Sequence, residues 1–128
     1  MIVLLDTHSF LWFAMGSSKL SQAARSLIED VNNERRFSIA SLWEMAIKIS
    51  IGKLTLEVSF DTLIPKQIHD NGIELVEVRH EHVSKIVSMP FHHKDPFDRM
   101  LVAQCLTEQW PIVSSDPLFD SDGVQRLW

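Results

Sequence analysis

The sequence has little of several residue types on which common kinds of protein site depend. Its 128 residues include one cysteine and four glycines. A single cysteine cannot form an internal disulfide, so we expect a chain that folds in a reducing, intracellular setting without a covalent staple. The glycines are scattered, which argues against the glycine-rich phosphate loops of mononucleotide- and dinucleotide-binding folds.

A basic excess and a membrane-length apolar run are also missing. The 17 acidic and 12 basic side chains give a formal net charge of −5, which argues against a large phosphate-binding face. The apolar start at residues 1–5 has no basic flank and meets Asp6 directly, so it is predicted to be neither a signal peptide nor a membrane span. We expect a soluble, cytoplasmic protein with no membrane partner. Such a chain can still act on nucleic acid if its acids surround a metal ion.

Short apolar runs alternate with segments of helical period. The runs at residues 1–5, 37–40, 75–78 and 112–113 are typical of buried strands. Helices are predicted at 21–33, 41–51, 60–72, 81–87 and 96–109. This alternation predicts one α/β domain over residues 1–128, with a mainly parallel sheet of four or five strands and helices packed against it.

Four acids lie where a predicted strand ends or in the first turn of the helix that follows. Asp6 and Asp116 end the first and fourth strands, whereas Glu44 and Asp98 occupy the third position of a predicted helix. Because ligands bind beyond the carboxyl ends of the strands in parallel α/β folds, these placements predict that the four acids share one edge of the sheet.

Each acid taken alone also has a structural explanation. Asp6 can cap the helix after it, and Asp116 precedes a proline in a turn-forming pair. Ser41 and Glu44 form a capping-box pattern, with Lys48 four residues on as an ion-pair partner. Asp95 is interpreted as the cap of a helix that begins at Pro96, which leaves Asp98 free to project as the better ligand candidate.

The set of acids favours a metal site more than any single member does. Like charges in close proximity repel each other, and a divalent cation offsets that repulsion. Oxygen donors without a nearby cysteine favour Mg²⁺ or Mn²⁺, which can activate water for attack on a phosphodiester. Other polar groups near the acids are candidates for supporting the site or holding substrate: Thr7, Lys48, His92, His93, Lys94 and Arg99. The alternative is that these side chains belong to the solvated surface. Asp120 and Asp122 are interpreted as solvated loop residues, and Cys105 as a packing residue.

These residues resemble the PIN-domain ribonucleases, in particular the VapC-type toxins of type II toxin–antitoxin pairs. The resemblance covers nearly the whole chain, and its most specific part is the stretch from Asp95 to Gln104. The motifs that carry it are Leu5-Asp6-Thr7-His8, Ser41-Leu42-Trp43-Glu44 with Lys48 and Gly52-Lys53-Leu54, Asp95-Pro96-Phe97-Asp98-Arg99, and Ser114-Ser115-Asp116.

The resemblance implies a three-layer α/β/α PIN fold and an endoribonuclease that depends on Mg²⁺ or Mn²⁺. By position, the family's metal-binding acids fall on Asp6, Glu44, Asp98 and Asp116, and Asp95 matches an acid common in this subgroup. The resemblance also implies a homodimer, an RNA substrate and a cognate antitoxin protein. Ser114 stands where the family more often has threonine, and the chain has no tyrosine in the region before the last strand, where relatives often carry an aromatic residue.

A catalytically silent PIN-like domain that acts only as a protein-binding partner is the main alternative, with the acids serving as helix caps. Retention of all four acids favours the nuclease. A separate hypothesis concerns residues 8–15, which are apolar around most of a helical circumference. We expect part of this segment, together with Trp12 and Trp43, to contact the antitoxin or a second subunit.

Overall fold

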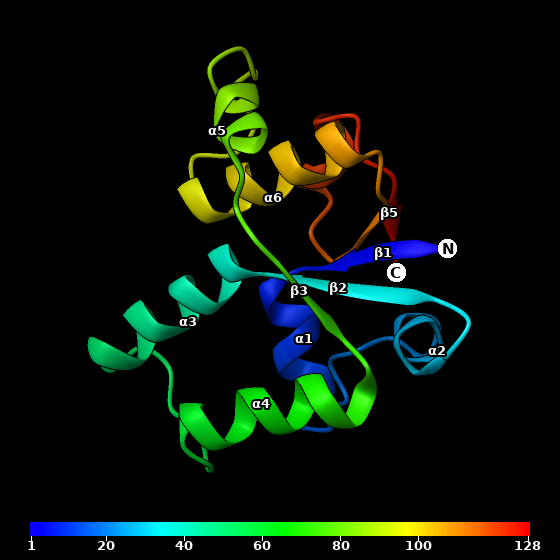
Figure 1. The fold of residues 1–128 in the computed structure, drawn as a ribbon, viewed down its shortest axis with the longest axis vertical. Coiled ribbons are helices and arrows are strands. Elements are labelled where there is room, and N and C mark those ends of the chain that lie inside the picture. The colour runs from blue at the N-terminus through cyan, green and yellow to red at the C-terminus, as the bar shows by residue number, and fades with distance from the viewer.

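A parallel β-sheet lies at the centre of the computed structural model, which describes residues 1–128 (Figure 1). Its five strands follow the order β3-β2-β1-β4-β5, and every neighbouring pair is parallel. This arrangement confirms the predicted α/β class, with all pairings parallel. The strands are β1 (Ile2–Leu5), β2 (Glu34–Ser38), β3 (Glu74–Val76), β4 (Ile112–Val113) and β5 (Arg126–Leu127).

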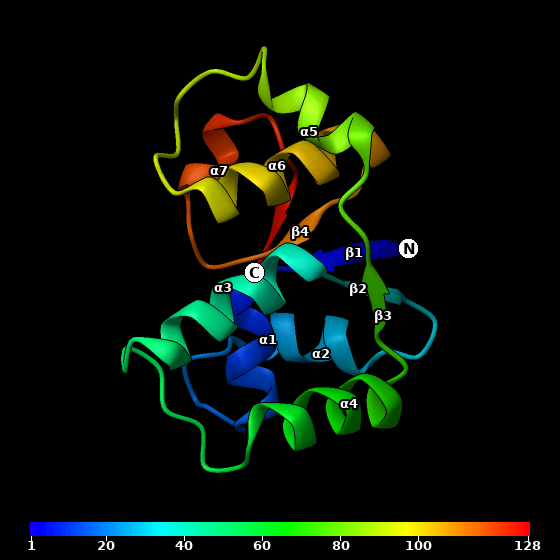
Figure 2. The same cartoon turned by 60° about the vertical axis from the view of Figure 1, so that its left-hand side comes forward.

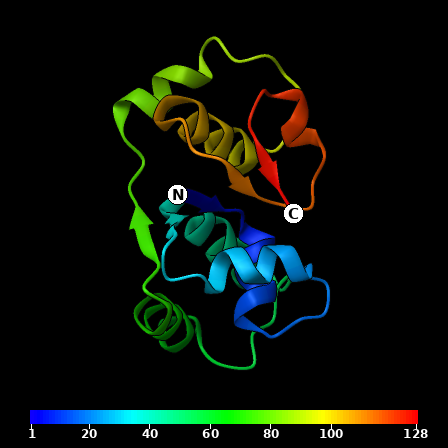
Figure 3. The ribbon, with the colours of Figure 1, turned by 90° about the vertical axis from the view of Figure 1, so that its right-hand side faces the viewer.

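Helices cover both faces of the sheet, as a three-layer fold requires. Figure 2 and Figure 3 show α1, α2 and α4 on one face and α5, α6 and α7 on the other. The remaining helix, α3, follows β2 directly and extends from the carboxyl edge of the strands. The helices are α1 (Thr7–Ala14), α2 (Gln22–Glu29), α3 (Ile39–Ser50), α4 (Phe60–Asn71), α5 (His80–Ile86), α6 (Pro96–Glu108) and α7 (Leu118–Ser121).

Strand β1 is the central strand and is buried on both faces. Val3 and Leu5 point into a core formed with α1, α2 and α4, whereas Leu4 points into a second core formed with α6. All three side chains are fully buried. The uninterrupted apolar run at the start of the chain therefore reflects a strand with helices on both sides.

The predicted capping residue of α3 is wrong by three positions. Ser41 is not the cap: the strand ends at Ser38, whose side chain accepts a hydrogen bond from the Ala40 backbone N–H at 3.1 Å. Ser41 and Glu44 lie inside the helix and are buried. The predicted capping box at Ser41 and Glu44 therefore does not exist, and Glu44 needs another explanation.

The other predicted elements are present with shifted ends. Strand β2 begins earlier than predicted, at Glu34, because its first residues are charged and the apolar run starts only at Phe37. Arg35 is nevertheless buried, with its guanidinium donating to the backbone carbonyls of Asp30 and Asn71. Strand β5 has two residues, too few to show a hydrophobic period. None of the helices combines the length and the apolar character needed to span a bilayer.

Candidate active site

Asp6 stands at the carboxyl edge of the sheet, where β1 and β4 end side by side. Its backbone N–H donates to the Val113 carbonyl at 3.2 Å, and its Oδ1 accepts from the Ser9 N–H at 2.7 Å. Asp6 therefore caps α1. Burial raises the pKa of the Asp6 carboxyl, an effect opposed by hydrogen bonds from Ser114 and Ser9. The fold keeps a carboxyl group in a position where its charge is costly.

Glu44 is buried beside Asp6 and is held by residues from two helices. Thr7 Oγ1 lies 2.7 Å from Glu44 Oε1, and Lys48 Nζ lies 2.7 Å from Glu44 Oε2. Thr7 Oγ1 is also 2.9 Å from Ser41 Oγ. A carboxylate only accepts, so the single Thr7 hydroxyl proton goes to Glu44 and the Ser41 hydroxyl donates to Thr7. Thr7 thus orients Glu44, and the predicted ion pair between Glu44 and Lys48 is present.

Asp98 projects from the first turn of α6 because the preceding aspartate takes the capping position. Asp95 Oδ1 accepts from the backbone N–H groups of Phe97 at 2.8 Å and Asp98 at 3.1 Å. Partial burial and the nearby charges of Asp95, Glu44, Asp6 and Asp116 raise the Asp98 pKa to about 7. The acids from four separate parts of the chain are therefore close enough to act on one carboxyl group.

Asp116 completes this set from the loop after β4. Its backbone N–H donates to Ser114 Oγ at 3.0 Å, and its Oδ1 accepts from the Leu118 N–H at 3.0 Å. The side chain therefore shapes the turn that the Asp-Pro pair predicted. Donor atoms of His93, Asp98 and Asp116 all lie within 4.8 Å of one another. This spacing suits the coordination of one metal ion, and the donors are mainly oxygens.

His93 and Asp122 are buried together beside the site, whereas the sequence interpretation placed Asp122 in solvent. Asp122 is not solvated: its side chain is 3% exposed, with Oδ2 2.8 Å from His93 Nε2. His93 is itself buried, and its Nδ1 is 3.6 Å from Asp98 Oδ2. Asp120, in contrast, is exposed and pairs with Arg126 at 3.1 Å. The only available signal was that His93 precedes Asp95-Pro96 by two residues.

Arg99, which the sequence offered as a candidate for holding substrate or as solvated surface, is buried in contacts with the protein itself. Its guanidinium donates to the carbonyls of Pro90 at 2.9 Å and Ile86 at 3.4 Å, and it stacks over the Phe91 ring at 4.1 Å. Arg99 is buried by these contacts. It therefore fixes the loop before α6. Lys94 and His92 are exposed and remain able to face a ligand.

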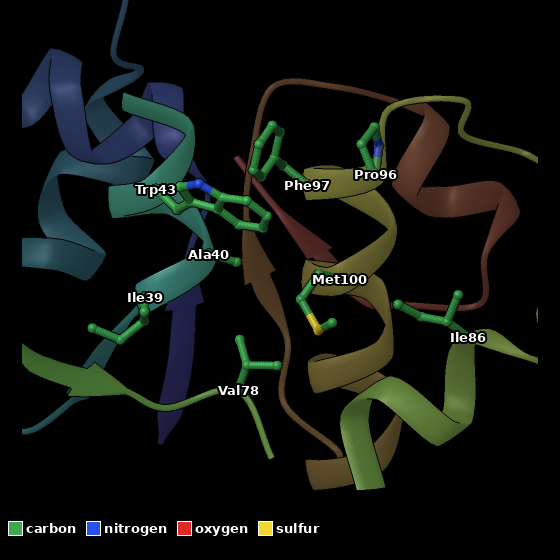
Figure 4. A pocket seen from close by; sticks show the side chains of 8 residues that line it. All are labelled: Ile39, Ala40, Trp43, Val78, Ile86, Pro96, Phe97 and Met100. Carbon is green, nitrogen blue, oxygen red and sulfur yellow. The ribbon is translucent and has the colours of Figure 1, made fainter. Parts of the chain in front are cut away.

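An apolar pocket of about 450 Å³ lies between α3 and α6, on the side of the two helices that carries Trp43 and Phe97 (Figure 4). Trp43 is 64% exposed, and its ring meets the Phe97 ring edge-to-face with 5.3 Å between centroids. Each aromatic residue immediately precedes a site acid, Glu44 or Asp98. The pocket is lined by Ile39, Ala40, Trp43, Val78, Ile86, Pro96, Phe97 and Met100.

The apolar segment of residues 8–15, which forms most of α1, is only partly buried. Trp12 and Phe13 are half-buried against the core, and Trp12 meets Trp128 with 5.9 Å between ring centroids. Met15 is exposed. Neither Trp12 nor Phe13 is fully buried, so the contact surface expected for this segment stays a prediction.

Several solved structures have a fold similar to that of this chain. One is VapBC2 from Rickettsia felis bound to a DNA fragment from its promoter, with a TM-score of 0.74 at 12% identity and full coverage of both chains. FitAcB from Neisseria gonorrhoeae has a TM-score of 0.65 at 11% identity, covering 97% of this chain and 95% of that one. A toxin–antitoxin complex from Klebsiella pneumoniae has a TM-score of 0.60 at 11% identity, covering 90% and 87%. At these identities the similarity concerns the fold.

Comparison with curated proteins found no significant match. A family model gives the more direct assignment. The model described as the PIN domain matches residues 3–121, a range that contains Asp6, Glu44, Asp98 and Asp116. With a match over most of its length and a parallel α/β/α architecture, the chain belongs to the PIN domain family.

Proposed function

We propose that this chain is a metal-dependent endoribonuclease and the toxin of a type II toxin–antitoxin pair. The observation that carries the proposal is the convergence of carboxylates on Asp98, whose pKa rises to about 7 in their presence. A structural role as helix caps does not account for Glu44 or Asp98, because Ser38 and Asp95 hold those capping positions.

The residues present fit a divalent cation. Asp6, Glu44, Asp98 and Asp116 are hard oxygen donors, and their mutual repulsion decreases when a cation binds among them. Carboxylate sites of this kind favour Mg²⁺ or Mn²⁺. When bound, the cation would supply Lewis acidity toward the phosphodiester and the attacking water. No residue of the chain is needed as a covalent nucleophile, and buried Cys105 is unsuited to that role because burial raises its thiol pKa.

The chain's own residues hold the acids in fixed orientations. Thr7 and Lys48 engage the two oxygens of Glu44, and the capping bond to Ser9 N–H fixes Asp6. Asp6 and Asp98 also stand at the amino ends of α1 and α6, where the helix dipoles contribute partial positive charge. This charge favours ionised acids and attracts a phosphate group from the substrate.

The proposal extends to the organisation and partners of the chain. We infer one PIN domain over residues 1–128, since both cores share strand β1. The likeness to toxin–antitoxin complexes supports a cognate antitoxin as partner. Half-buried Trp12 and exposed Trp43 offer apolar surface for that antitoxin or for a second subunit of a homodimer.

The decisive variant is Asp6→Asn, because the amide oxygen can still accept the capping bond from Ser9. We expect it to abolish cleavage of a single-stranded RNA in Mg²⁺ buffer while changing the free energy of unfolding by less than about 1 kcal/mol, the worth of one cap. The matched control is Asp61→Asn, an exposed aspartate in the first turn of α4, which should cleave normally.

RNA cleavage that persists in Asp6→Asn, or in wild-type protein with excess chelator, would contradict the metal mechanism. A wild-type protein that folds, binds an antitoxin and cleaves no RNA would instead support the silent PIN-like binding domain. The two outcomes are separated by assaying antitoxin binding on the same preparations.

A further inference from the structure

The buried side chains of His93 and Asp122 form a pair at the border of the acid cluster. His93 is 3% exposed and packs against the Phe119 ring with 4.7 Å between centroids. Its two nitrogens face two different carboxylates: Nδ1 is 3.6 Å from Asp98 Oδ2, and Nε2 is 2.8 Å from Asp122 Oδ2. The ring therefore lies between a site acid and a second carboxylate that α7 and its following loop bring to the site.

Neither facing atom of the pair completes a hydrogen bond. His93 Nε2 and Asp122 Oδ2 are fully buried and lie 2.8 Å apart, but neither forms an aligned hydrogen bond with the other or with any other group. Unpartnered buried polar atoms are costly. A small rotation of the ring would align a proton on Nε2 with Asp122 and leave the Nδ1 lone pair directed toward Asp98.

The Nδ1 lone pair and the carboxylate oxygens that it faces repel each other, and a cation bound between them would remove this repulsion. Donor atoms of His93, Asp98 and Asp116 lie within 4.8 Å of one another. Donors that share one ion with bond lengths near 2.1 Å are separated by roughly 3.0–4.2 Å, so small side-chain movements suffice. Histidines that bind metal in proteins almost always donate their other ring N–H to a carboxylate. Asp122 Oδ2 lies at hydrogen-bond distance from Nε2, and rotation of the ring on metal binding would align the two atoms.

We propose that His93 Nδ1 is a direct ligand of the divalent cation, together with Asp98 and Asp116, and that Asp122 orients the ring. This inference rests on the proposed function in so far as the same acids hold the cation. It adds a selectivity that an all-carboxylate site lacks. Imidazole nitrogen suits first-row transition ions, whereas Mg²⁺ prefers oxygen. The site should therefore bind Mn²⁺ in preference to Mg²⁺.

Electron spin echo envelope modulation of the Mn²⁺ complex tests the proposal without any activity measurement. The wild-type chain should show ¹⁴N coupling from a directly bound imidazole, and His93→Gln should lose it. Mn²⁺ titrated by its free-ion electron paramagnetic resonance signal should bind at least tenfold more weakly to His93→Gln. Mg²⁺ affinity, measured by competition, should change much less. The matched control is His92→Gln, the exposed neighbouring histidine, which should leave both ions unaffected.

Asp122→Asn provides a second variant that keeps His93 in place and guards against a misfolded His93→Gln. It should retain ¹⁴N coupling and weaken Mn²⁺ binding by about 10–100-fold, as loss of an orienting carboxylate does. Circular dichroism on both variants checks that they fold.

Absence of ¹⁴N coupling in wild-type protein, coupling that survives in His93→Gln, or failure to bind Mn²⁺ would each overturn the ligand assignment. RNA cleavage without ¹⁴N coupling would remove the assignment and leave the proposed nuclease intact, with His93 as an ion-paired partner of Asp98. ¹⁴N coupling without RNA cleavage would support the ligand assignment and contradict the proposed nuclease.

Discussion

At the scale of single residues, Asp98 links folding stability to pH. Its pKa lies at about 7 in the folded chain, against an ordinary value of 3.8, because partial burial and nearby acids disfavour its charge. Between these values the folded state binds more protons than the unfolded state, so the free energy of unfolding falls as pH rises from about 4 to 7. Without metal, Asp98→Asn should therefore match wild-type stability near pH 4 and exceed it at pH 8. We expect an excess on the order of 1–2 kcal/mol, below the full linkage value because the carboxyl is partly solvated.

Urea unfolding in chelator at pH 4, 6 and 8 measures this difference. Asp61→Asn serves as the control, because Asp61 is an exposed first-turn aspartate outside the acid cluster, and it should not produce the same pH trend. An Asp98→Asn protein that is less stable than wild type at pH 8 would contradict the electrostatic account of the site.

Thr7 supports the site through one hydroxyl group that is shared by two buried partners. Thr7→Val keeps the shape of the side chain but leaves Glu44 and Ser41 without this partner. We expect a loss of about 1–3 kcal/mol in the free energy of unfolding. RNA cleavage should also be slower, because Glu44 loses one of the two side chains that fix its orientation. Thr7→Ser restores the hydroxyl and should recover most of both quantities. A stable, active Thr7→Val together with a destabilised Thr7→Ser would show that the methyl group matters and the hydrogen bond does not.

The residues that sequence alone could identify are those whose placement follows from local rules. Asp98 was identifiable because Asp95 and Pro96 mark the start of a helix, and the third position of that helix is then known. The contact between His93 and Asp122 was not identifiable, because it joins two loops that are distant in the sequence. A buried histidine beside a carboxylate has no local pattern, so only the assembled fold brings the pair together.

At the scale of elements, the first turn of α3 depends on Ser38. Its Oγ accepts the Ala40 N–H, and the side chain is fully buried. Ser38→Ala should lower the free energy of unfolding by about 0.5–2 kcal/mol through loss of this cap. RNA cleavage below the unfolding transition should stay within about twofold of wild type, since packing of Met45 still holds the helix. Urea denaturation and initial cleavage rates measure the two effects.

The matched control for this variant is Ser21→Ala, which removes the equivalent cap of α2, where Ser21 accepts the Ala24 N–H at 3.0 Å. Helix α2 carries none of the four acids, so a similar loss of stability without any change in cleavage is expected there. If Ser38→Ala were neutral for stability, the start of α3 would have to be fixed by packing alone.

The α3 boundary also shows why element ends resist prediction from sequence. Ser38 and Ser41 are both competent caps, and the pattern from Ser41 to Glu44 matches a capping box. Tertiary structure decides which serine caps the helix, because Ser41 is buried against Thr7 and is therefore not the capping residue. In α6 no such competition exists: Asp95 and Pro96 fix the start, and the structure begins the helix at Pro96 as expected.

At the scale of the whole molecule, the acid cluster joins two halves of the fold. Asp6 and Glu44 come from the helices that pack on one core, whereas Asp98 and Asp116 come from α6 and the loop after β4. The adjacent strands β1 and β4 contribute buried side chains to both cores. An ion held by acids from both halves would therefore stabilise their union as well as the site itself.

This arrangement predicts that metal binding stabilises the chain globally. At a Mn²⁺ concentration about 100 times the dissociation constant, the free energy of unfolding should rise by about 2.7 kcal/mol over its value in chelator. Hydrogen exchange should slow around Glu44 in α3 and at the amino end of α6, because each segment presents an acid to the ion. Asp61→Asn should keep both effects and Asp98→Asn should lose them. Protection confined to α6 would mean that Glu44 takes no part in holding the ion, since α3 would then open as freely with metal as without it.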